Sequence, residues 1–335
     1  MTYNTAEFPD VYYLPEYADL FREFDHGKPE TFRYKGDFGD VLYSFLLRPI
    51  DWEGVPNGYS DIISPYGYGG PVMLHGLPQK EEEVIRGFNR SFTSYCADKK
   101  IVSEFVRFHP LLNNADYCKR IYDASFNRNT VAIDLSLRNP FEESFSSTCR
   151  NRIRNALKNG VTVEFDFDGK TVSTFYRLYT LTMDKNHASG YYYFSEEFFR
   201  KSMQTLRGSI FLLNARFEEN IVGSVMFLHH NGYMHYHFPA TDPEYYSLAC
   251  NNLIMSEAVQ WGKENNMRLI HLGGGYTTAP DDPLLRFKKT FSKLGLRDFW
   301  IGKRIHNQEI YQKLVDSVFE RKETPHPDFF PLYRA

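Results

Sequence analysis

The stretch SIFLLNARFEENIVGSVMFLHHNGYMHYHFPA, Ser209 to Ala240, decides the fold class. It holds three runs of strand length that are rich in branched and aromatic residues. The turn residues Glu219 and Asn220 separate the first two runs, and Asn231 and Gly232 separate the last two. The stretch therefore predicts three successive β-strands.

Helices and further strands are predicted on both sides of this stretch. Before it come a strand at 161–167, a helix at 170–186 with apolar residues at helical spacing, and a helix that opens on Ser195. After it come a helix at 248–266, a strand at 268–273, a helix at 283–294 and a strand at 297–305. The predicted order is βααβββαβαβ.

The secondary structure of the first half of the chain is less clearly predicted. Strands are expected near 41–48, 58–63, 101–109 and 130–136, around a helix near 80–98. The fold class is thus α/β (α+β), with a mixed sheet flanked by helices. We expect two related lobes, residues 1–138 and residues 139–335, the second of which includes a linking helix at 141–159. A single sheet-rich lobe with a decorated N-terminus is the competing interpretation.

Composition excludes several classes of protein. The 335 residues carry a formal net charge of −3, so no overall basic field attracts DNA. The sequence has neither an apolar run of about 18 residues nor a signal-peptide pattern, which predicts a cytoplasmic protein without a transmembrane segment. The four cysteines are far apart, and His235 and His237 have no suitably spaced acidic partner, so we expect no metal site.

An unusual loop follows a predicted strand in SDIISPYGYGGPVM, Ser60 to Met73. Its glycines allow close backbone approach and its tyrosines can stack on a flat ligand. Tyr66, Gly67 and Tyr68 are therefore candidate substrate-binding residues, and His109, which follows another strand, is a further one. A packed surface loop and a buried structural histidine are the alternatives.

The segment SFSSTCRNRIRNALKNG, Ser144 to Gly160, predicts a helix with Arg150 and Arg154 one turn apart. Guanidinium groups at this spacing suit an anion, because arginine makes bidentate contacts to carboxylate and phosphate. The alternative is a solvated basic face.

The segment HLGGGYTTAPDDPLLRFKKTF, His271 to Phe291, ends a strand in three glycines and then begins a helix that Asp281 or Asp282 can cap. Phe287 and Phe291 form a core pair one turn apart, which places Lys288 and Lys289 on the exposed or cleft-facing side. Lys288 could hold a phosphate or the developing oxyanion of an acyl transfer. An ordinary solvated lysine pair is the alternative.

Four segments together resemble the FemABX-like branch of the GNAT superfamily, which includes peptidyltransferases of peptidoglycan synthesis and relatives known as acetyltransferases. They are SPYGYGGP, SEFVRFHPLLNN, CRNRIRNALKNGVTVEF and HLGGGYTTAPDDPLLRFKKTF. The resemblance spans about residues 40–305 and implies two GNAT-like lobes with the arginine helix between them. It also implies that Lys288 matches the lysine of the F-K-x-x-F pattern, and that the tyrosine loop and His109 line the cleft between the lobes with Arg150 and Lys288.

One departure from the superfamily bears on the acyl donor. The R/Q-x-x-G-x-G/A loop that grips coenzyme A in ordinary GNAT enzymes is replaced here by TDPEYYSLACNN, Thr241 to Asn252. This favours an aminoacyl-tRNA donor modestly, although the chain is not basic overall and has no coiled-coil arm. Both aminoacyl-tRNA and acyl-CoA stay open, and no tightly bound cofactor is expected. The general base is also open among Asp281, Asp282, Tyr236 and solvent; Tyr236 is in addition a candidate substrate-binding residue.

These features predict an acyl or aminoacyl transferase that acts on an amine of a peptidoglycan-type precursor or a similar metabolite. The alternatives are a coenzyme A dependent N-acetyltransferase and a non-catalytic module that binds a nucleotide sugar or a peptide. No serine or cysteine nucleophile pattern is present, and direct attack of an amine on an activated acyl group needs none.

Overall fold

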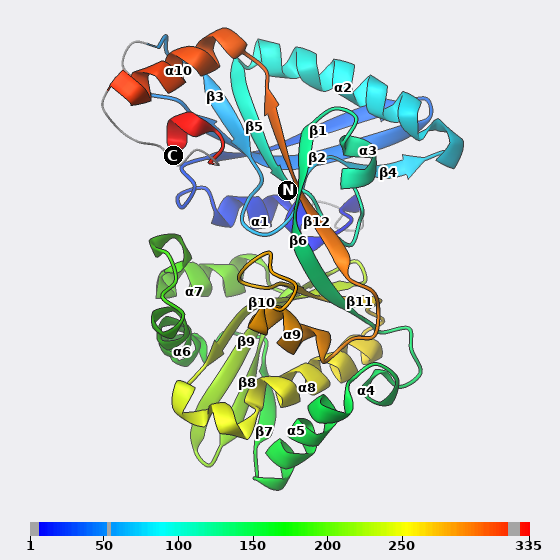
Figure 1. Ribbon diagram of the computed structural model, residues 1–335, viewed down its shortest axis with the longest axis vertical. Helices are drawn as coiled ribbons and strands as arrows, with labels where there is room; N and C mark the ends of the chain where they lie inside the picture. The colour runs from blue at the N-terminus through cyan, green and yellow to red at the C-terminus, as the bar shows by residue number, and fades with distance from the viewer. Residues whose placement is uncertain (1–6, 52–54, 321–328) are drawn as a thin grey trace. The chain divides into compact units, whose positions relative to one another are not determined.

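The computed structural model describes residues 7–51, 55–320 and 329–335 (Figure 1). The chain divides into two compact units that are discontinuous in sequence. Unit 1 comprises residues 1–11 and 128–297, and unit 2 comprises residues 12–127 and 298–335. Each unit contains its own run of neighbouring strands and its own hydrophobic core.

These units correct the expected boundaries at 1–138 and 139–335. Strand β12 (Arg297–Ile305) pairs antiparallel with β5 (Ile101–Arg107), and helix α10 (Gln308–Glu320) follows it. Residues Ile310 and Leu314 of α10 join Ile50 and Val102 in one buried cluster. The C-terminal segment therefore belongs with the N-terminal strands, and the last predicted strand lies, from residue 298 on, in unit 2.

The strands of unit 1 follow one another in the predicted order of elements. Its strands are β6 (Asp123–Asp134), whose residues from Arg128 belong to this unit, β7 (Thr162–Asp166), β8 (Ile210–Phe217), β9 (Asn220–His230), β10 (Tyr233–Thr241) and β11 (Leu269–Gly274). They lie in the order β6-β11-β10-β9-β8-β7. All neighbours are antiparallel except β10 and β11, which are parallel. The predicted mixed sheet is confirmed, with β6 in the place next to β11.

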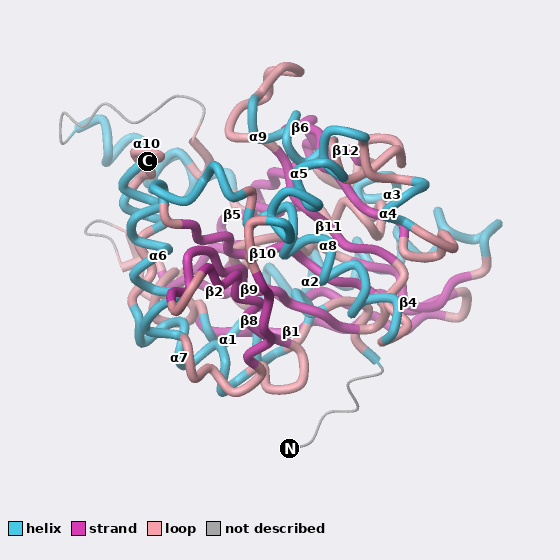
Figure 2. Tube along the Cα trace, turned by 90° about the horizontal axis from the view of Figure 1, so that it is seen from below, coloured by secondary structure: helices cyan, strands magenta, loops and turns pink. Residues whose placement is uncertain are grey.

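Helices cover both faces of this sheet, and Figure 2 shows α6 and α7 on one side of β8 to β10 and α5 and α8 on the other. The helices are α4 (Pro140–Glu143), α5 (Ser147–Lys158), α6 (Val172–Lys185), α7 (Glu196–Thr205), α8 (Cys250–Glu264) and α9 (Pro283–Lys289). Alternation along the strands explains the two layers. Phe211 and Leu213 share a buried cluster with residues of α5 and α8, whereas Phe238 packs its ring against Tyr179 of α6 and Phe199 of α7.

Strands β10 and β11 separate after a short parallel pairing. The pairing covers only Tyr233–His235 opposite Leu269–His271. Beyond it, the register between β10 and β9 shifts between Tyr236 and Phe238, so His237 is the residue of a β-bulge. The two strands then end in different loops, so the sheet opens between them. The bulge also interrupts the strand alternation that would place Tyr233, His235 and His237 on one face.

Unit 2 is built on the strands that run in the order β1-β2-β3-β5-β12, and β4 pairs with β2. Its other strands are β1 (Lys28–Gly36), β2 (Gly39–Pro49), β3 (Ser60–Ile63) and β4 (Val72–Gly76), and its other helices are α1 (Pro15–Leu20), α2 (Glu81–Asp98) and α3 (Ala115–Cys118). The apolar stripe of α2 packs on this sheet, where Phe92 contacts the rings of Phe32 and Tyr43. In the described residues, no helix is long and apolar enough to cross a membrane.

Candidate active site

The glycine run at the end of β11 is held against the start of α9. Asp282 is the N-cap of α9: its Oδ1 accepts a hydrogen bond from the Leu285 N–H at 2.9 Å, and its Oδ2 accepts from the N–H and the hydroxyl of Thr277. A Cβ atom on Gly275 would lie 2.3 Å from Oδ1 of Asp282, so only glycine fits there. The carboxylate therefore closes the loop from 275 to 282 and sets the position of α9.

These contacts also determine the charge of Asp282. Burial alone would raise the pKa of this carboxyl, but hydrogen bonds from the backbone of Leu285 and Thr277 and from the Thr277 hydroxyl lower it below its ordinary value. Asp282 is an ionised cap with both oxygens occupied. This disfavours it among the four open candidates for the general base.

Lys288 lies on the buried side of α9, with 8% of its surface exposed. Its Nζ donates a hydrogen bond to the carbonyl oxygen of Gly274, the last residue of β11, at 2.7 Å. Burial lowers the pKa of Lys288 to about 7; the Asp282 carboxylate opposes this shift and Arg128 adds to it. Of the two lysines expected on the exposed or cleft-facing side, Lys289 is exposed and Lys288 is buried.

Three tyrosines interact near the point where β10 and β11 separate. Tyr236 on β10 is buried, and burial raises its pKa, with smaller contributions from Tyr276 and Tyr246. Tyr276 follows the glycine run, and its pKa is raised by partial burial, by Tyr246 and by Asp282. Tyr236 is thus a neutral phenol at neutral pH, which can donate a hydrogen bond or a proton but does not act as a base.

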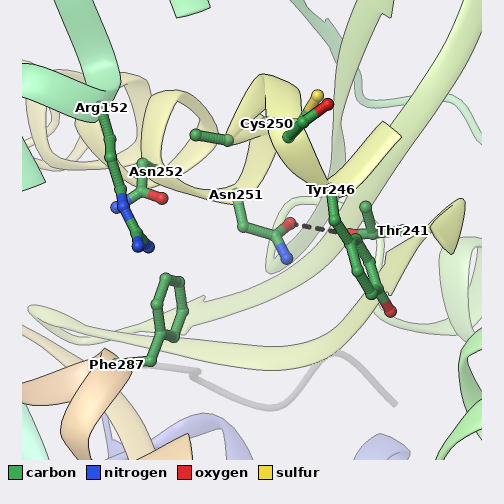
Figure 3. Close-up of a pocket in the computed structure, with 9 residues that line it drawn as sticks. Arg152, Thr241, Tyr246, Cys250, Asn251, Asn252 and Phe287 are labelled. Carbon is green, nitrogen blue, oxygen red and sulfur yellow. Dashed lines mark hydrogen bonds between the residues drawn. The ribbon is translucent and has the colours of Figure 1, made fainter. Parts of the chain in front are cut away.

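A cavity of about 300 Å³ lies at the start of α8 (Figure 3). Its lining residues come from four places: Arg152 of α5, Thr241 of β10, the segment Tyr246, Ser247, Ala249, Cys250, Asn251 and Asn252, and Phe287 of α9. In Figure 3 Asn251 lies between Arg152 and Tyr246, and its Oδ1 accepts a hydrogen bond from the Thr241 hydroxyl at 3.1 Å.

The backbone of this cavity suits an anionic ligand. Ala249 adopts the left-handed conformation at φ 54° and is the N-cap of α8, and no side chain caps the helix. The first N–H groups of a helix and its dipole favour negative charge at this end. Together with the Arg152 guanidinium, the cavity combines positive potential, amide groups and an aromatic wall.

The family comparison agrees with this arrangement. Residues 143–289, from the end of α4 to the end of α9, match the family described as Acetyltransferase (GNAT) domain. Over these residues the chain is similar to a GNAT acetyltransferase domain, and we call this matched segment the GNAT domain. This GNAT domain holds the splayed strands, Lys288 and the cavity, and it classes the protein as an acyltransferase.

Solved structures extend the likeness to the whole chain. A structure of FemX has a TM-score of 0.70 and 12% identity, and the likeness covers 92% of this chain and 96% of that one. The C-terminal domain of a putative lysylphosphatidylglycerol synthetase from Agrobacterium fabrum has a TM-score of 0.54 and 10% identity, with 96% and 93% covered. L-PGS from Bacillus licheniformis has a TM-score of 0.52 and 15% identity, with 87% and 92% covered.

At these identities the likeness shows the fold alone, a fold that this chain shares with the FemX structure. No curated protein sequence matches the chain.

Within the GNAT domain, the two predicted arginines of α5 bind a carboxylate of the chain itself. Arg150 donates to the carbonyl oxygen of Phe145 at 2.6 Å and lies 3.5 Å from a carboxylate oxygen of Glu142. Arg154 lies 3.5 Å from the other oxygen of Glu142. Both therefore hold the corner between α4 and α5, whereas Arg152 lines the cavity. A substrate role for Arg150 and Arg154 stays a prediction.

The remaining predicted residues belong to unit 2, where they are packed into one aromatic cluster. The Tyr66 carbonyl accepts from the Tyr17 hydroxyl, and the Tyr68 ring contacts the Tyr12 ring edge-on at 5.6 Å. Gly67 has φ 96°, and a Cβ there would lie 2.5 Å from the Tyr12 ring. Packing against Tyr12 therefore requires a glycine at position 67. This agrees with the alternative interpretation of the segment, a packed surface loop.

His109 is buried beside the same cluster, 1% exposed. Its backbone N–H donates to Oδ1 of Asn114, and its Nδ1 accepts from the Leu111 N–H at 3.2 Å. The Asn114 amide in turn donates to the carbonyl oxygens of Gly69 and Pro71, so this asparagine fixes the glycine loop. The roles of Tyr66, Gly67, Tyr68 and His109 in substrate binding stay predictions.

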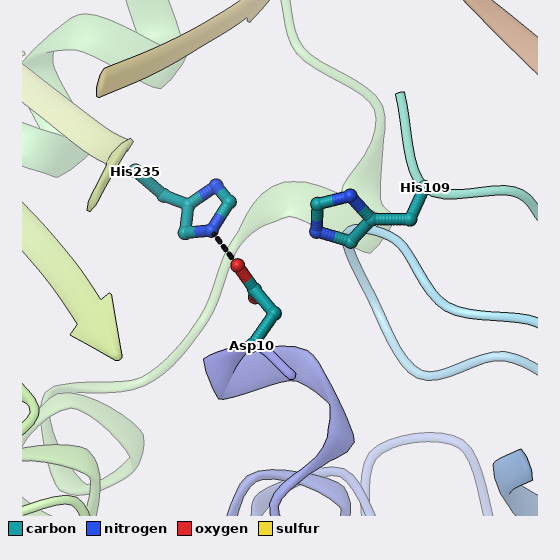
Figure 4. Close-up of side chains that lie close together, drawn as sticks. All are labelled: Asp10, His109 and His235. Carbon is teal, nitrogen blue, oxygen red and sulfur yellow. Dashed lines mark hydrogen bonds and ion pairs between the residues drawn. The ribbon is translucent and has the colours of Figure 1, made fainter. Parts of the chain in front are cut away.

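A buried hydrogen bond between two side chains fixes the segment before residue 12 to unit 1. Oδ2 of Asp10 lies 2.8 Å from Nε2 of His235 on β10 (Figure 4), and both side chains are buried. Next to it in sequence, burial lowers the pKa of His237 to about 3, with a contribution from His235. His237 is therefore a neutral imidazole at the β-bulge.

Sequence reasoning missed Arg152, Asn251 and Tyr246. Each lies in a segment that was singled out for another reason, the arginine helix or the substitute for the coenzyme A loop. The available signal was the helical phase of α5: Cys149, Ile153 and Ala156 are buried, so Arg152 projects from a different side than Arg150 and Arg154.

Proposed function

We propose that this protein transfers an aminoacyl group from aminoacyl-tRNA to an amine of a peptidoglycan-type precursor or a similar metabolite. The donor would enter where β10 and β11 separate. One observation carries the proposal: Lys288, a buried lysine with a pKa near 7, lies at the end of β11 beside that separation. Charged tRNA and nucleotide-linked precursors are both cytoplasmic, so the proposal also requires a cytoplasmic protein.

The chemistry follows from the groups present. The acceptor amine attacks the ester carbonyl carbon, a C–N bond forms, and the C–O bond to the terminal ribose breaks. Negative charge develops on the carbonyl oxygen, and the Lys288 ammonium in a water-poor site stabilises it. The proton lost by the amine passes to the leaving ribose oxygen.

The replacement of the coenzyme A loop supports an aminoacyl-tRNA donor. Instead of a glycine-rich turn, the segment between β10 and α8 is the 3-10 helix η5 (Pro243–Leu248), capped by the side chain of Asp242. This segment presents a tyrosine to the cavity rather than a row of glycine amides. The likeness to FemX and to proteins named lysylphosphatidylglycerol synthetase supports the same donor, because one of these names states a lysyl product.

A coenzyme A dependent N-acetyltransferase is the second candidate. The observation that favours it is the family match, whose description is that of an acetyltransferase domain. In that case the leaving group is a thiolate, and the same Lys288 would stabilise the same oxyanion.

A donor panel separates these functions. Purified protein is incubated with peptidoglycan precursors and either labelled aminoacyl-tRNA or labelled acetyl-CoA, and the label in the acceptor is measured. We expect transfer from aminoacyl-tRNA and none from acetyl-CoA. Transfer from acetyl-CoA alone would establish the second candidate, and binding of precursors without any transfer would contradict both.

A further inference from the structure

The side chain of Arg128 continues the contact between β6 and β11 beyond the point where their backbone pairing ends. The last pair of this ladder is Gly274 opposite Thr130. Two residues along β6, Arg128 donates from Nη1 to the carbonyl oxygens of Gly275 at 2.8 Å and Tyr276 at 3.3 Å. The guanidinium therefore binds the two carbonyl groups that follow strand β11.

This close approach depends on the glycine at the end of the strand. A Cβ atom on Gly274 would lie 2.8 Å from the carbonyl oxygen of Asn129 and 2.9 Å from Cδ of Arg128. Any side chain there would have to displace the backbone of β6 or the stem of the arginine. Gly274 and Arg128 are therefore fitted to each other.

Three successive carbonyl groups of the glycine run are bound by cations. Nζ of Lys288 donates to the carbonyl oxygen of Gly274 at 2.7 Å, and Arg128 donates to the next two. One residue further, the Thr277 N–H donates to Oδ2 of Asp282 at 2.9 Å. Two cations and one carboxylate thus fix the main chain from residue 274 to residue 277.

This arrangement leaves Lys288 with donors that the protein does not use. An ammonium has three N–H groups, and within the described part of the chain the Gly274 carbonyl is the one hydrogen-bond acceptor of Nζ. Because Lys288 is only 8% exposed, its other N–H groups are costly to bury unless a ligand accepts from them. The next acceptors along the main chain, the carbonyl groups of Gly275 and Tyr276, are held by Arg128.

We propose that Arg128 is a positioning residue for Lys288. It holds the carbonyl groups that follow Gly274, so the ammonium stays on Gly274 and its remaining N–H groups stay available to the acyl carbonyl. This inference rests on the proposed function and deepens it. Arg128 acts through the glycine run and Lys288, without contact to the donor or the acceptor.

Arg128 also acts on Lys288 by its charge. Burial lowers the pKa of Lys288 most, the Asp282 carboxylate at the start of α9 raises it, and Arg128 of β6 lowers it further. On the same helix, the neighbouring Lys289 is exposed. Removal of the guanidinium therefore moves the pKa of Lys288 up from about 7 towards its ordinary value.

Denaturant unfolding across pH measures this effect without any turnover. Arg128→Met keeps much of the stem and removes the charge and the donors. It is compared with the double variant Arg128→Met/Lys288→Met, as the wild type is compared with Lys288→Met. In the wild type, the contribution of Lys288 to the free energy of unfolding starts to increase near pH 7.

Without Arg128, we expect this increase to begin at a higher pH and to be smaller. The reason is that the pKa of Lys288 in the folded chain then lies closer to its pKa in the unfolded chain. An arginine with a merely structural role would instead change the stability by the same amount at every pH. Arg128→Gln, which also removes the charge, takes the place of Arg128→Met if the methionine variant does not fold.

Transfer of label to the acceptor is the second readout, measured at about pH 6, where Lys288 is charged in every variant. Arg128→Met should lower the rate about 10- to 100-fold, because Lys288 is no longer held in place. Arg128→Lys keeps a cation and a donor, so it should recover part of the rate and begin its increase in stability near the same pH as the wild type. Arg286→Met, a change of an exposed arginine of α9, should match the wild type in both measurements.

The two readouts separate this inference from the proposed function. An increase that begins at the same pH as in the wild type, or a wild-type rate of transfer, in Arg128→Met overturns the positioning role. An increase that begins at a higher pH, in a protein that transfers nothing, would refute the proposed function and leave the link between Arg128 and Lys288 standing.

Discussion

Lys288 carries the proposed chemistry, and its surroundings determine its charge. The side chain is surrounded by protein, with one hydrogen bond to the Gly274 carbonyl and one nearby carboxylate, Asp282. Desolvation disfavours the ammonium more than Asp282 favours it, so the group titrates near neutrality. A lysine in this state can be charged when the oxyanion forms and neutral after the product leaves.

The depressed pKa of Lys288 predicts a pH-dependent stability. The unfolded chain binds a proton at this group up to its ordinary pKa of 10.5, whereas the folded chain loses it above about 7. Between these values the unfolded state binds more protons, so the free energy of unfolding rises with pH through this window. We expect the stability of the wild type relative to Lys288→Met to increase from about pH 7 to about pH 10, and to be flat below pH 6.

Denaturant unfolding of the two proteins across this pH range measures the effect. Lys289→Met serves as the control, because Lys289 is exposed on the same helix and should follow the wild type at every pH. A stability difference between wild type and Lys288→Met that does not change with pH would show that Lys288 has an ordinary pKa.

At the scale of single residues, the sequence singled out Lys288 as a candidate residue but did not predict that its side chain is buried. The F-K-x-x-F spacing predicted the core pair, and the rings of Phe287 and Phe291 are indeed 5.1 Å apart. The burial of Lys288 follows from the return of the loop between β11 and α9, which helical periodicity does not encode. The pairing of Arg150 and Arg154 with Glu142 depends likewise on the turn between α4 and α5.

At the scale of elements, the position of α9 depends on its cap. Asp282→Ala removes the acceptors for the N–H groups of Leu285 and Thr277. Loss of such a cap costs about 1 to 2 kcal/mol of stability, and the loop that supports Lys288 loses its closure. We expect lower stability and a lower transfer rate together, measured by denaturant unfolding and by the labelled transfer assay.

Asp281→Ala is the matched control, because Asp281 is exposed and Asp282 is the residue that caps α9. It should leave both quantities unchanged. Equal stability of the two alanine variants would contradict the capping role.

Most elements were predictable because their pattern is local. Strands β7 to β11 and helices α6 to α9 appear in the predicted order, since amphipathic spacing and caps such as Ser195 define each one separately. Strands β1 and β4 were missed, and β6 begins at Asp123, well before the expected residue 130. The first part of β6 is largely polar and partly exposed, so it carries little hydrophobic signal.

At the scale of the whole molecule, contacts distant in sequence decide which segments form a unit. Asp61 on β3 is fully buried and accepts from Arg48, Tyr333 and Arg334. Glu104 on β5 is also fully buried, and its Oε2 lies 2.9 Å from Nε2 of His306. The contacts of Tyr333 and Arg334 with Asp61 and of His306 with Glu104 join the C-terminal segment to strands of the N-terminal part. Local sequence patterns cannot predict these contacts, because each partner, taken alone, is only a polar residue in a strand or near the end of the chain. A unit boundary based on such patterns is therefore misplaced.

The central claim is that the charge of Lys288 drives acyl transfer in the GNAT domain, and a comparison of two methionine variants tests it most directly. Transfer of label from aminoacyl-tRNA to the acceptor is measured for wild type, Lys288→Met and Lys289→Met under saturating donor. Loss of a preorganised charge contact predicts a rate about a hundredfold lower for Lys288→Met, with wild-type rate for Lys289→Met. Equal rates in the two variants would contradict the account.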